Sequence, residues 1–158
     1  MHMKGRQERR FQVDLEHLEN FRFMSQASED DVLHGKPYLS DEPDPVGEAA
    51  GPSTPALLAS SIAHCLSASL LETLKKSRIT VLNFKAKGVG IVAENEEGLP
   101  RIKGVEVVLQ PTVSEHSGRL KQCEAVFQQY CTVCSSLKPA IDIKVSVKWV
   151  YADSLVNA

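Results

Sequence analysis

The sequence predicts an α+β fold of 158 residues, with antiparallel sheets arranged around one long central helix. Three observations predict it. Apolar residues alternate with polar ones near both ends of the chain, as in half-buried strands. A stretch without Asp, Glu, Lys or Arg, over residues 49–71, lies between them and contains enough residues for a long helix. The order of the expected elements lacks the regular βαβ alternation of a parallel sheet.

Residues 8–40 are predicted to form a meander of three strands. The first two strands carry apolar side chains at alternate positions: Phe11, Val13, Leu15, Phe21 and Phe23. A turn is expected at residues 19–20, and the third strand over residues 32–39. The next segment, 41–54, is predicted to be a long irregular loop, because its prolines interrupt regular structure. A loop of this length is usually functional or wraps a partner.

The central helix is predicted over residues 55–76. Thr54 is its candidate N-cap, and Pro55 takes the first helical position, where a missing N–H costs nothing. Lys75 and Lys76 stand at the end, where cations suit the helix dipole. Up to residue 71 its only ionisable side chain apart from the thiol of Cys65 is His64, and apolar residues cover much of its circumference. Such a helix is expected to be central and enclosed.

The remaining part, 79–151, is predicted to hold a second sheet and a second helix. Two strands are expected on either side of a polar turn at residues 94–100. A helix follows at about 115–130, with an apolar face made by four residues: Leu120, Cys123, Phe127 and Tyr130. The final strand, 141–151, has the clearest alternation of apolar and polar residues.

Composition and charge are those of an ordinary globular domain. Hydrophobic residues make up 42% and charged residues 24%, and the net charge is −2. The net charge therefore produces no positive electrostatic field that would attract nucleic acid or an anionic membrane. The basic run at residues 4–10 is interpreted as a solvated chain end. The first twenty residues contain no apolar signal segment, and the helical part of residues 49–71 is too short and polar to span a bilayer comfortably. We expect a cytoplasmic protein without nucleic-acid or membrane partners.

The four cysteines raise the main question about chemistry. Without a secretory signal, a structural disulfide framework is not expected. A buried cysteine such as Cys65 is by default a small core residue, but serines and His64 on the same helix need polar partners or a cavity. His64 points about 100° away from Cys65 around the helix and is interpreted as structural. Cys123 is interpreted as a core residue of the second helix.

Cys131 and Cys134 form a C-x-x-C pair. A zinc site needs four ligands, and the sequence has no second such pair; Cys123 and His116 could complete one, though nothing in the spacing favours it. A thioredoxin-like centre would follow a strand and open a helix. The remaining interpretation is a thiol near the surface, at a helix end, that reaches another thiol.

Several blocks of the sequence resemble one family. They are DEPDPVGE over 41–48, GPSTP over 51–55, LLA over 57–59, HCLSASLL over 64–71, YCTV over 130–133 and SL over 136–137. These blocks are similar to the OsmC-like proteins, the osmotically induced and organic-hydroperoxide-resistance (Ohr) group, across roughly residues 11–151. The resemblance implies a single OsmC-like domain over residues 1–158. It also implies an intertwined homodimer with two long central helices packed between curved sheets.

The resemblance further implies a thiol-dependent hydroperoxide reductase that needs no cofactor and no metal. Cys65 matches the cysteine that attacks the hydroperoxide O–O bond and becomes a sulfenic acid. Cys131 matches the resolving cysteine that closes an intramolecular disulfide. An external thiol, often a lipoylated protein, then restores the enzyme. The apolar helix is expected to line a pocket for an organic hydroperoxide.

Two further positions follow from the resemblance. Arg22 is the candidate for the arginine that contacts the attacking thiolate. The family's glutamate usually lies ten residues before the attacking cysteine, where this chain has Pro55, so Glu48 or Glu42 from the loop is expected to replace it. An arginine is also required on physical grounds. A helix dipole fades within the first turn and does not reach a thiol about ten residues into the helix, and a guanidinium can serve thiolate and peroxide together.

Two other classes of function remain as alternatives. One is a non-catalytic OsmC-like dimer that binds an apolar ligand or senses oxidants. The other is a small structural protein that binds zinc through the cysteines.

Overall fold

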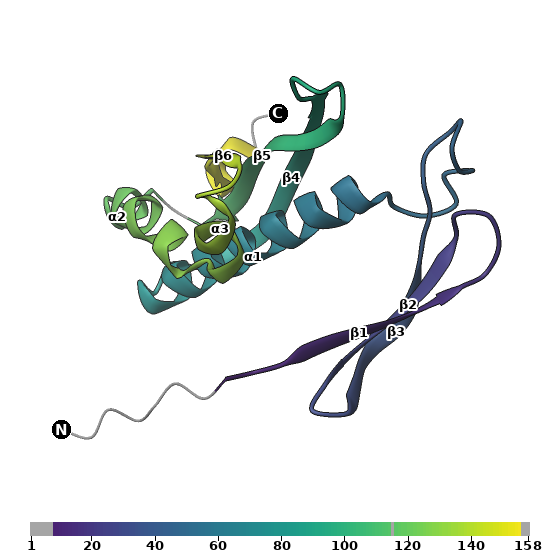
Figure 1. Cartoon of the computed structure of the whole chain (residues 1–158). Helices are drawn as coiled ribbons and strands as arrows, with labels where there is room; N and C mark the ends of the chain where they lie inside the picture. The colour runs from purple at the N-terminus through teal and green to yellow at the C-terminus, as the bar shows by residue number, and fades with distance from the viewer. Residues whose placement is uncertain (1–7, 115, 156–158) are drawn as a thin grey trace. The chain divides into compact units, whose positions relative to one another are not determined.

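The computed structural model describes residues 8–114 and 116–155 (Figure 1). The chain forms two compact units, and the boundary between them falls between Thr54 and Pro55. The first unit holds the predicted meander and loop. The second begins with the central helix and contains the remaining elements.

The first unit is a three-stranded antiparallel sheet, as predicted. Its strands, β1 (Phe11–His17), β2 (Phe23–Glu29) and β3 (Val32–Ser40), pair in the order β1-β2-β3. Asp30 and Asp31 connect β2 to β3 with φ angles of 49° and 63°, the left-handed region that tight hairpins require. The expected half-burial of β1 is wrong: Phe11 and Leu15 are 69% and 60% exposed, because no second layer covers this sheet within its own unit.

The loop that follows β3 is irregular, as predicted, and one buried side chain organises it. The carboxylate of Asp41 accepts hydrogen bonds from three backbone N–H groups, those of Glu42 (2.8 Å), Glu48 (3.2 Å) and Ala50 (3.0 Å). Gly47 sits so close to this turn that a Cβ would lie 2.2 Å from the carbonyl oxygen of Glu42. Only glycine fits there, and the loop folds around Asp41.

The second unit begins with α1 (Thr54–Lys76), which matches the predicted central helix. Its buried side chains recur at helical spacing along one face: Ala59, Ile62, Ala63, Leu66, Leu70 and Leu74. The expectation of an enclosed helix is wrong for the single chain, because the sheet and the other helices cover only this face and Leu71 is 39% exposed. Among the described residues, α1 is the helix that has the length and composition to cross a membrane, with a mean hydropathy of 1.4. The packing of its buried face is that of a core helix.

The sheet of the second unit contains one parallel connection that the sequence analysis did not expect. Its strands are β4 (Val81–Glu94), β5 (Pro100–Val113), β6 (Asp142–Val147) and the short β7 (Val150–Tyr151). β4 and β5 are antiparallel, but β6 and β7 both run parallel to β5. The expectation of purely antiparallel sheets is therefore wrong here, because helices lead the chain from the end of β5 back to its start before β6 begins.

One face of this sheet packs against α1. Alternate residues of β5 and β6, among them Val105, Val107 and Ile143, point into the core, which confirms the apolar alternation over β6. The predicted single strand over residues 141–151 is wrong in its extent, because residues 148–149 leave the sheet and separate β6 from β7. On β4, two glycines allow the helix to approach closely. A Cβ at Gly88 would lie 2.9 Å from the carbonyl oxygen of Ala59.

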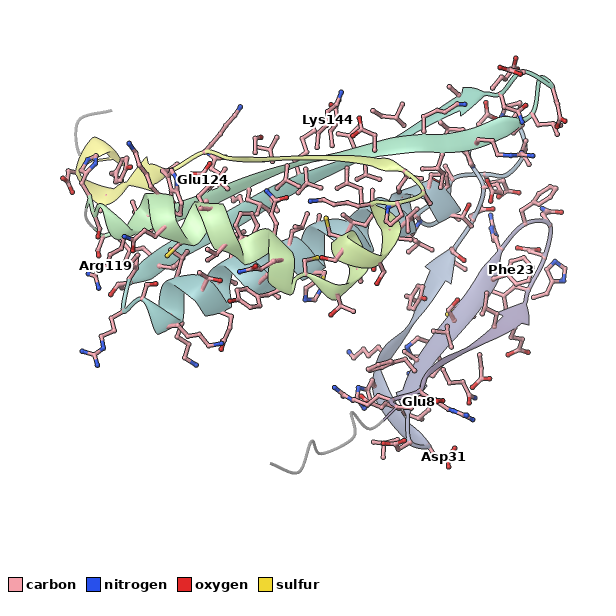
Figure 2. All side chains as sticks on the ribbon, turned by 60° about the vertical axis from the view of Figure 1, so that its left-hand side comes forward. Glu8, Phe23, Asp31, Arg119, Glu124 and Lys144 are labelled. Atoms are coloured by element: carbon pink, nitrogen blue, oxygen red, sulfur yellow. The ribbon has the colours of Figure 1, made fainter. Side chains whose placement is uncertain are left out.

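Three short helical segments complete the core on the same side as α1: α2 (Arg119–Val126), the 3-10 turn η1 (Phe127–Tyr130) and α3 (Thr132–Leu137). Both overall views show them beside α1 (Figures 1 and 2). A fourth helix, α4 (Ala152–Leu155), follows β7.

The predicted helix at 115–130 is shorter than expected and ends in the tighter η1 turn. Leu120, Cys123 and Phe127 are buried, as predicted, but Tyr130 is 66% exposed because the 3-10 turn rotates it off the apolar face. Trp149 Nε1 donates to the carboxylate of Glu124 over 2.9 Å and ties α2 to the segment between β6 and β7.

Candidate functional site

Cys65 lies near the middle of α1 and is half-buried. It opens onto a cavity of about 520 Å³ on the flank of α1 that faces η1. The cavity is lined from α1 and its end by Cys65, Ala68, Ser69, Glu72, Thr73, Lys76 and Ser77, and from the opposite side by Val126 and Tyr130. Most of the lining surface is apolar, with hydroxyl groups along one side and the ion pair of Glu72 and Lys76 (3.3 Å) at the C-terminal part of α1. A small molecule in this cavity would reach the Cys65 thiol.

Cys131 lies between η1 and α3 and is fully buried. It is the N-cap residue of α3, with extended backbone angles (φ −79°, ψ 104°), and its Sγ accepts a hydrogen bond from the backbone N–H of Cys134 over 3.3 Å. Cys134 is fully buried as well. The expectation of a thiol near the surface is therefore wrong. The C-x-x-C pair stands at a helix end, as expected, but this end is covered by the core of the unit.

Cys65, Cys131 and Cys134 are free cysteines, and Cys131 lies between the other two as their common neighbour. Burial raises the pKa of Cys131 to about 12, assisted by the neighbouring thiols of Cys65 and Cys134 and opposed by the hydrogen bond from the Cys134 backbone. Burial also raises the pKa of Cys134, while the charge of Lys138 and a hydrogen bond with Cys131 oppose that shift. Cys131 is thus held as a neutral thiol in contact with Cys65.

The other polar groups of α1 do not all serve this cluster. Ser67 and Thr73 donate to backbone carbonyl oxygens of their own helix, those of Ala63 (2.7 Å) and Ser69 (2.8 Å). His64 is exposed. The crowding of polar residues around Cys65 is therefore only a weak signal of a site, because the helix backbone satisfies part of it.

Cys123 is a core residue, as predicted. Its Sγ donates to Ser77 Oγ over 3.2 Å, and it links α2 to the end of α1. Within residues 8–114 and 116–155, no group of three or more His, Cys, Asp and Glu side chains is arranged to hold a metal ion. His116 stacks on Tyr151 with ring centroids 3.5 Å apart.

Arg22 is the centre of a charged cluster in the first unit. Its guanidinium pairs with Glu48, with Glu19 (2.6 Å) and, more distantly, with Asp41 (Nε to Oδ2, 3.9 Å). The buried Nε of Arg22 has no hydrogen-bond partner within the described residues. Of the two loop glutamates considered for this role, Glu48 is the one that the structure pairs with Arg22.

Asp41 positions Glu48, and the sequence analysis did not single it out. Backbone hydrogen bonds, the one from Ala50 first, lower the pKa of Asp41 against the opposing effect of burial, and the charge of Arg22 adds to this. The carboxylate therefore stays ionised and fixes the loop from residue 41 to residue 50. The only signal in the sequence was an Asp at the start of a proline-rich loop.

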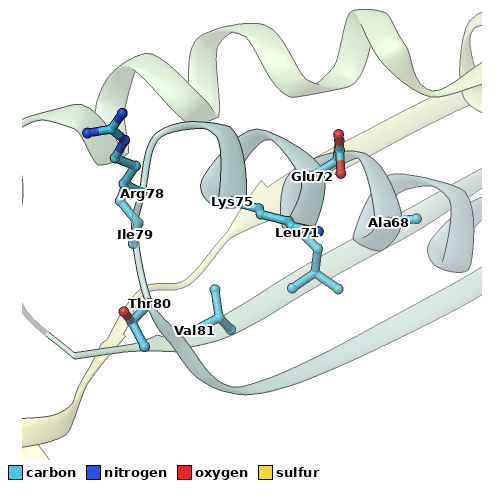
Figure 3. Close-up of a pocket in the computed structure, with 8 residues that line it drawn as sticks. All are labelled: Ala68, Leu71, Glu72, Lys75, Arg78, Ile79, Thr80 and Val81. Atoms are coloured by element: carbon cyan, nitrogen blue, oxygen red, sulfur yellow. The ribbon is translucent and has the colours of Figure 1, made fainter.

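A second hollow, of about 700 Å³, lies beside the C-terminal end of α1 (Figure 3). Leu71 from α1 and Val81 from β4 contribute apolar surface, and Lys75 and Arg78 contribute charge. No cysteine lines it. It therefore has no direct part in thiol chemistry.

The sequence matches the family profile described as OsmC-like protein over residues 47–146. The chain belongs to the OsmC-like protein family. The matched region includes the loop from Gly47 onward, all of α1, and both Cys65 and Cys131. A search of curated protein sequences gives no match.

Solved structures support the OsmC-like fold. An OsmC-like protein from Mycoplasma pneumoniae superposes with a TM-score of 0.69 at 17% identity, covering 92% of this chain and 99% of that one. An OsmC-like protein of unknown function from Vibrio cholerae gives 0.68 at 16% identity, covering 90% and 99%. The organic hydroperoxide resistance protein OhrB of Bacillus subtilis gives 0.59 at 17% identity, covering 88% and 98%. At these identities the likeness concerns the fold.

The predicted site residues are brought together as two pairs. Cys65 meets Cys131 in the second unit, and Arg22 meets Glu48 in the first. Three features were not anticipated: the anchor Asp41, the burial of Cys134 against Cys131, and the cavity wall formed by Tyr130.

Proposed function

We propose that this OsmC-like protein is a cysteine-based peroxidase that reduces organic hydroperoxides. The observation that carries the proposal is the contact between the thiols of Cys65 and Cys131, one of which opens onto a cavity while the other is buried. Two thiols in contact can pass from dithiol to disulfide with little movement of the backbone.

The reaction balances with one hydroperoxide and two thiols. The Cys65 thiolate attacks the outer oxygen of R–O–O–H, the O–O bond breaks, and RO⁻ leaves and is protonated to the alcohol. Cys65 becomes a sulfenic acid. The Cys131 thiol then attacks its sulfur, forms the S–S bond and releases water. An external dithiol, which we propose to be a lipoylated protein or a small thiol, reduces the disulfide.

The environments of the two thiols favour this division of roles. A nucleophilic cysteine must reach the substrate as a thiolate. Cys131 is fully buried with a pKa raised to about 12, so it is almost entirely protonated near neutral pH. Cys65 borders the cavity and is the thiol that a hydroperoxide meets first. Cys131 then needs only to react with a sulfur already beside it.

We propose that Arg22, held by Glu48, acts on the Cys65 thiolate and on the departing oxygen. Lowering the pKa of a thiol raises its thiolate fraction but lowers its nucleophilicity, so the gain in rate from ionisation is limited. Donors that stabilise charge on the leaving oxygen contribute more. A guanidinium carries five donors in a fixed fork, so it can bind Glu48 and still donate to a thiolate or an oxyanion.

The substrate class follows from the cavity. Its apolar lining suits the alkyl or acyl part of an organic hydroperoxide better than hydrogen peroxide, which has no apolar part to bury. We propose a cytoplasmic location, where four unpaired cysteines are stable.

We also propose that the protein acts as a homodimer. Several large apolar side chains are exposed in the single chain, including Phe11, Leu15 and Leu33 on the meander and Leu71 on α1. Exposed apolar surface of this kind marks an interaction site. We propose that a second copy of the chain buries these apolar side chains, in keeping with the dimer that the OsmC-like resemblance implies.

Rapid mixing of the reduced protein with an alkyl hydroperoxide tests the proposal. We expect fast loss of two thiols per chain, faster with the alkyl hydroperoxide than with hydrogen peroxide. Cys65→Ser should abolish the reaction, and Cys123→Ser, the matched control in the core, should retain it. Slow thiol loss that is equal in Cys65→Ser and the unmodified protein would contradict the proposal.

The cavity beside Cys65 also favours a second function, binding of an apolar ligand without catalysis. The two functions differ in what happens to the thiols. A purely binding protein would take up an alkyl ligand and leave Cys65 and Cys131 reduced after exposure to one equivalent of alkyl hydroperoxide.

A further inference from the structure

The peroxidase proposed above needs two cysteines, yet a third thiol lies in the same cluster. Cys134 is fully buried, follows Cys131 by three residues and lies within hydrogen-bonding reach of it. Cys123 differs from it because its thiol donates to Ser77 Oγ just after the end of α1 and does not contribute to the pKa of Cys131. Neither attack on the hydroperoxide nor formation of the first disulfide requires Cys134.

Cys131 and Cys134 are placed so that they can form a disulfide bond. Cys131 is the N-cap of α3 and Cys134 is the third residue of that helix, and the backbone N–H of Cys134 already donates to Cys131 Sγ over 3.3 Å. This capping bond holds the Cys131 sulfur over the first turn, on the side where the Cys134 side chain begins. A disulfide between these positions needs rotation of side chains only.

We propose that Cys134 is a second resolving cysteine, which takes the disulfide from Cys65 and stores it as a Cys131–Cys134 bond. This role rests on the proposed peroxidase function. In the exchange, the Cys134 thiolate attacks Cys131 Sγ in the Cys65–Cys131 disulfide. The Cys131–Cys134 bond forms, the Cys65–Cys131 bond breaks, and Cys65 leaves as a thiolate. The proton lost by Cys134 is balanced by the one that Cys65 can take up, and no further oxidant or reductant is required.

The surroundings of the cluster favour attack at the Cys131 sulfur. A thiol with a raised pKa is a poor leaving group, so expulsion of Cys131 from the disulfide is disfavoured. Attack that keeps Cys131 in the bond and expels Cys65 avoids this cost. Burial keeps most of Cys134 protonated, which limits the rate of the exchange, and the exchange begins only once the Cys65–Cys131 bond exists, so the two steps follow one another in time.

This transfer of the disulfide from Cys65 to Cys134, here called the relay, changes the number of hydroperoxide equivalents that one chain consumes. After exchange, Cys65 is again a free thiol and can attack a second hydroperoxide before any external reductant arrives. The second attack leaves Cys65 as a sulfenic acid, because Cys131 and Cys134 are already joined. Without reductant, one chain therefore consumes two equivalents of hydroperoxide, whereas a two-cysteine peroxidase consumes one.

The experiment treats the reduced full-length protein with one equivalent of alkyl hydroperoxide, quenches it in acid at increasing times and maps the disulfides. We expect the Cys65–Cys131 bond first, followed by its decay as the Cys131–Cys134 bond grows. Titration with excess hydroperoxide should consume two equivalents and leave a sulfenic acid at Cys65 that a sulfenic-acid trap labels. Cys134→Ser should stop at the Cys65–Cys131 bond and one equivalent, and Cys123→Ser should behave like the unmodified protein.

The outcomes separate this role from the proposed function. A stable Cys65–Cys131 bond, reduced Cys134 and a stoichiometry of one in the unmodified protein would overturn the relay and leave the peroxidase intact. Failure of Cys65 to oxidise at all would overturn both. If Cys134→Ser does not fold, Cys134→Ala replaces it, and the time course of the unmodified protein still decides the question.

Discussion

The guanidinium of Arg22 pairs with the carboxylate of Glu48, 26 residues further along the chain. Glu48 stands in the loop that Asp41 fixes, and its own backbone N–H donates to Asp41 (3.2 Å). This chain has Pro55 at the start of α1, where the family resemblance places a glutamate. The loop therefore brings a carboxylate to the arginine from a different place in the sequence.

Removal of the Arg22 guanidinium should slow the reaction with hydroperoxide and change folding little. Loss of one donor to a developing oxyanion typically costs about 10²–10³ in rate, and we expect a loss of at least about 10² for Arg22→Ala. Rapid mixing with an alkyl hydroperoxide measures the rate, and urea unfolding measures stability. An unchanged rate would remove Arg22 from the mechanism.

Glu48 and Glu42 offer a matched pair of variants. Glu48→Gln removes the charge that holds Arg22, so we expect a drop in rate of about 10-fold, on the scale of a charge-assisted hydrogen bond. Glu42→Gln changes a neighbouring carboxylate of the same loop and should react at the unmodified rate. Equal rates for both variants would contradict the assignment to Glu48.

Asp41 should make the loop sensitive to acid. Its pKa is lowered in the folded protein by backbone hydrogen bonds, so the stabilisation is fully present above the ordinary value of 3.8 and is lost as the pH falls through the lowered value. We expect Asp41→Asn to be less stable than the unmodified protein at neutral pH, with a difference that shrinks toward about pH 2.

Urea unfolding of both proteins across this range measures the difference. Asp44→Asn, an exposed carboxylate in the same loop, is the control and should show no such trend. A stability difference for Asp41→Asn that stays constant down to the lowest pH would rule out its carboxylate as the acid-sensitive anchor.

Much of this architecture could be predicted from the pattern of the sequence. The alternation at Phe11, Val13 and Leu15 locates β1 because side chains point to opposite faces at each step. Pro55 in the first turn and the two lysines at the end of α1 indicate its bounds, because proline suits the start of a helix and cations suit its C-terminal dipole; the structure begins α1 at Thr54, the residue proposed as its cap. These are local signals, and the structure confirms the elements that they indicate.

The errors concern properties that are not local. Alternation at Ile143 and Val145 gives a strand but not its direction, and the helices before β6 make it parallel to β5. The pattern placed Tyr130 on an apolar face because it assumed an unbroken helix, whereas the η1 turn rotates it outward. The burial of Cys134 depends on the packing of segments distant in sequence, which spacing does not reveal.

The contact between β4 and α1 should not tolerate a side chain at Gly88. A Cβ there would meet the carbonyl oxygen of Ala59 at 2.9 Å, and backbone atoms on both sides leave little freedom to adjust. Overpacking of this kind costs about 1–3 kcal/mol, and we expect Gly88→Ala to lose that much unfolding free energy in urea.

Gly118→Ala is the control for this substitution. Gly118 has a φ of −59°, and among the described residues beyond its two chain neighbours no heavy atom lies within 4 Å of the position a Cβ would take. Its stability should change by less than about 1 kcal/mol. Equal effects at the two glycines would mean that α1 and β4 do not approach as closely as described.

The proposed homodimer can be tested without a variant. The apolar residues of the meander and of α1 that are exposed in the single chain would be buried by association of two chains. Sedimentation equilibrium at micromolar concentration should give twice the chain mass of 17.4 kDa. A folded, monodisperse monomer under these conditions would contradict the dimer.

The identity of the first disulfide formed tests the central claim most directly. The reduced protein receives a short pulse of about one equivalent of alkyl hydroperoxide, is quenched in acid and is mapped by peptide mass spectrometry. Because the Cys65 thiol borders the cavity and lies beside the buried Cys131, we predict a Cys65–Cys131 bond at the earliest times. Cys131 joined to Cys134 while Cys65 is still reduced, at every time including the earliest, would contradict the assignment of Cys65 as the attacking cysteine.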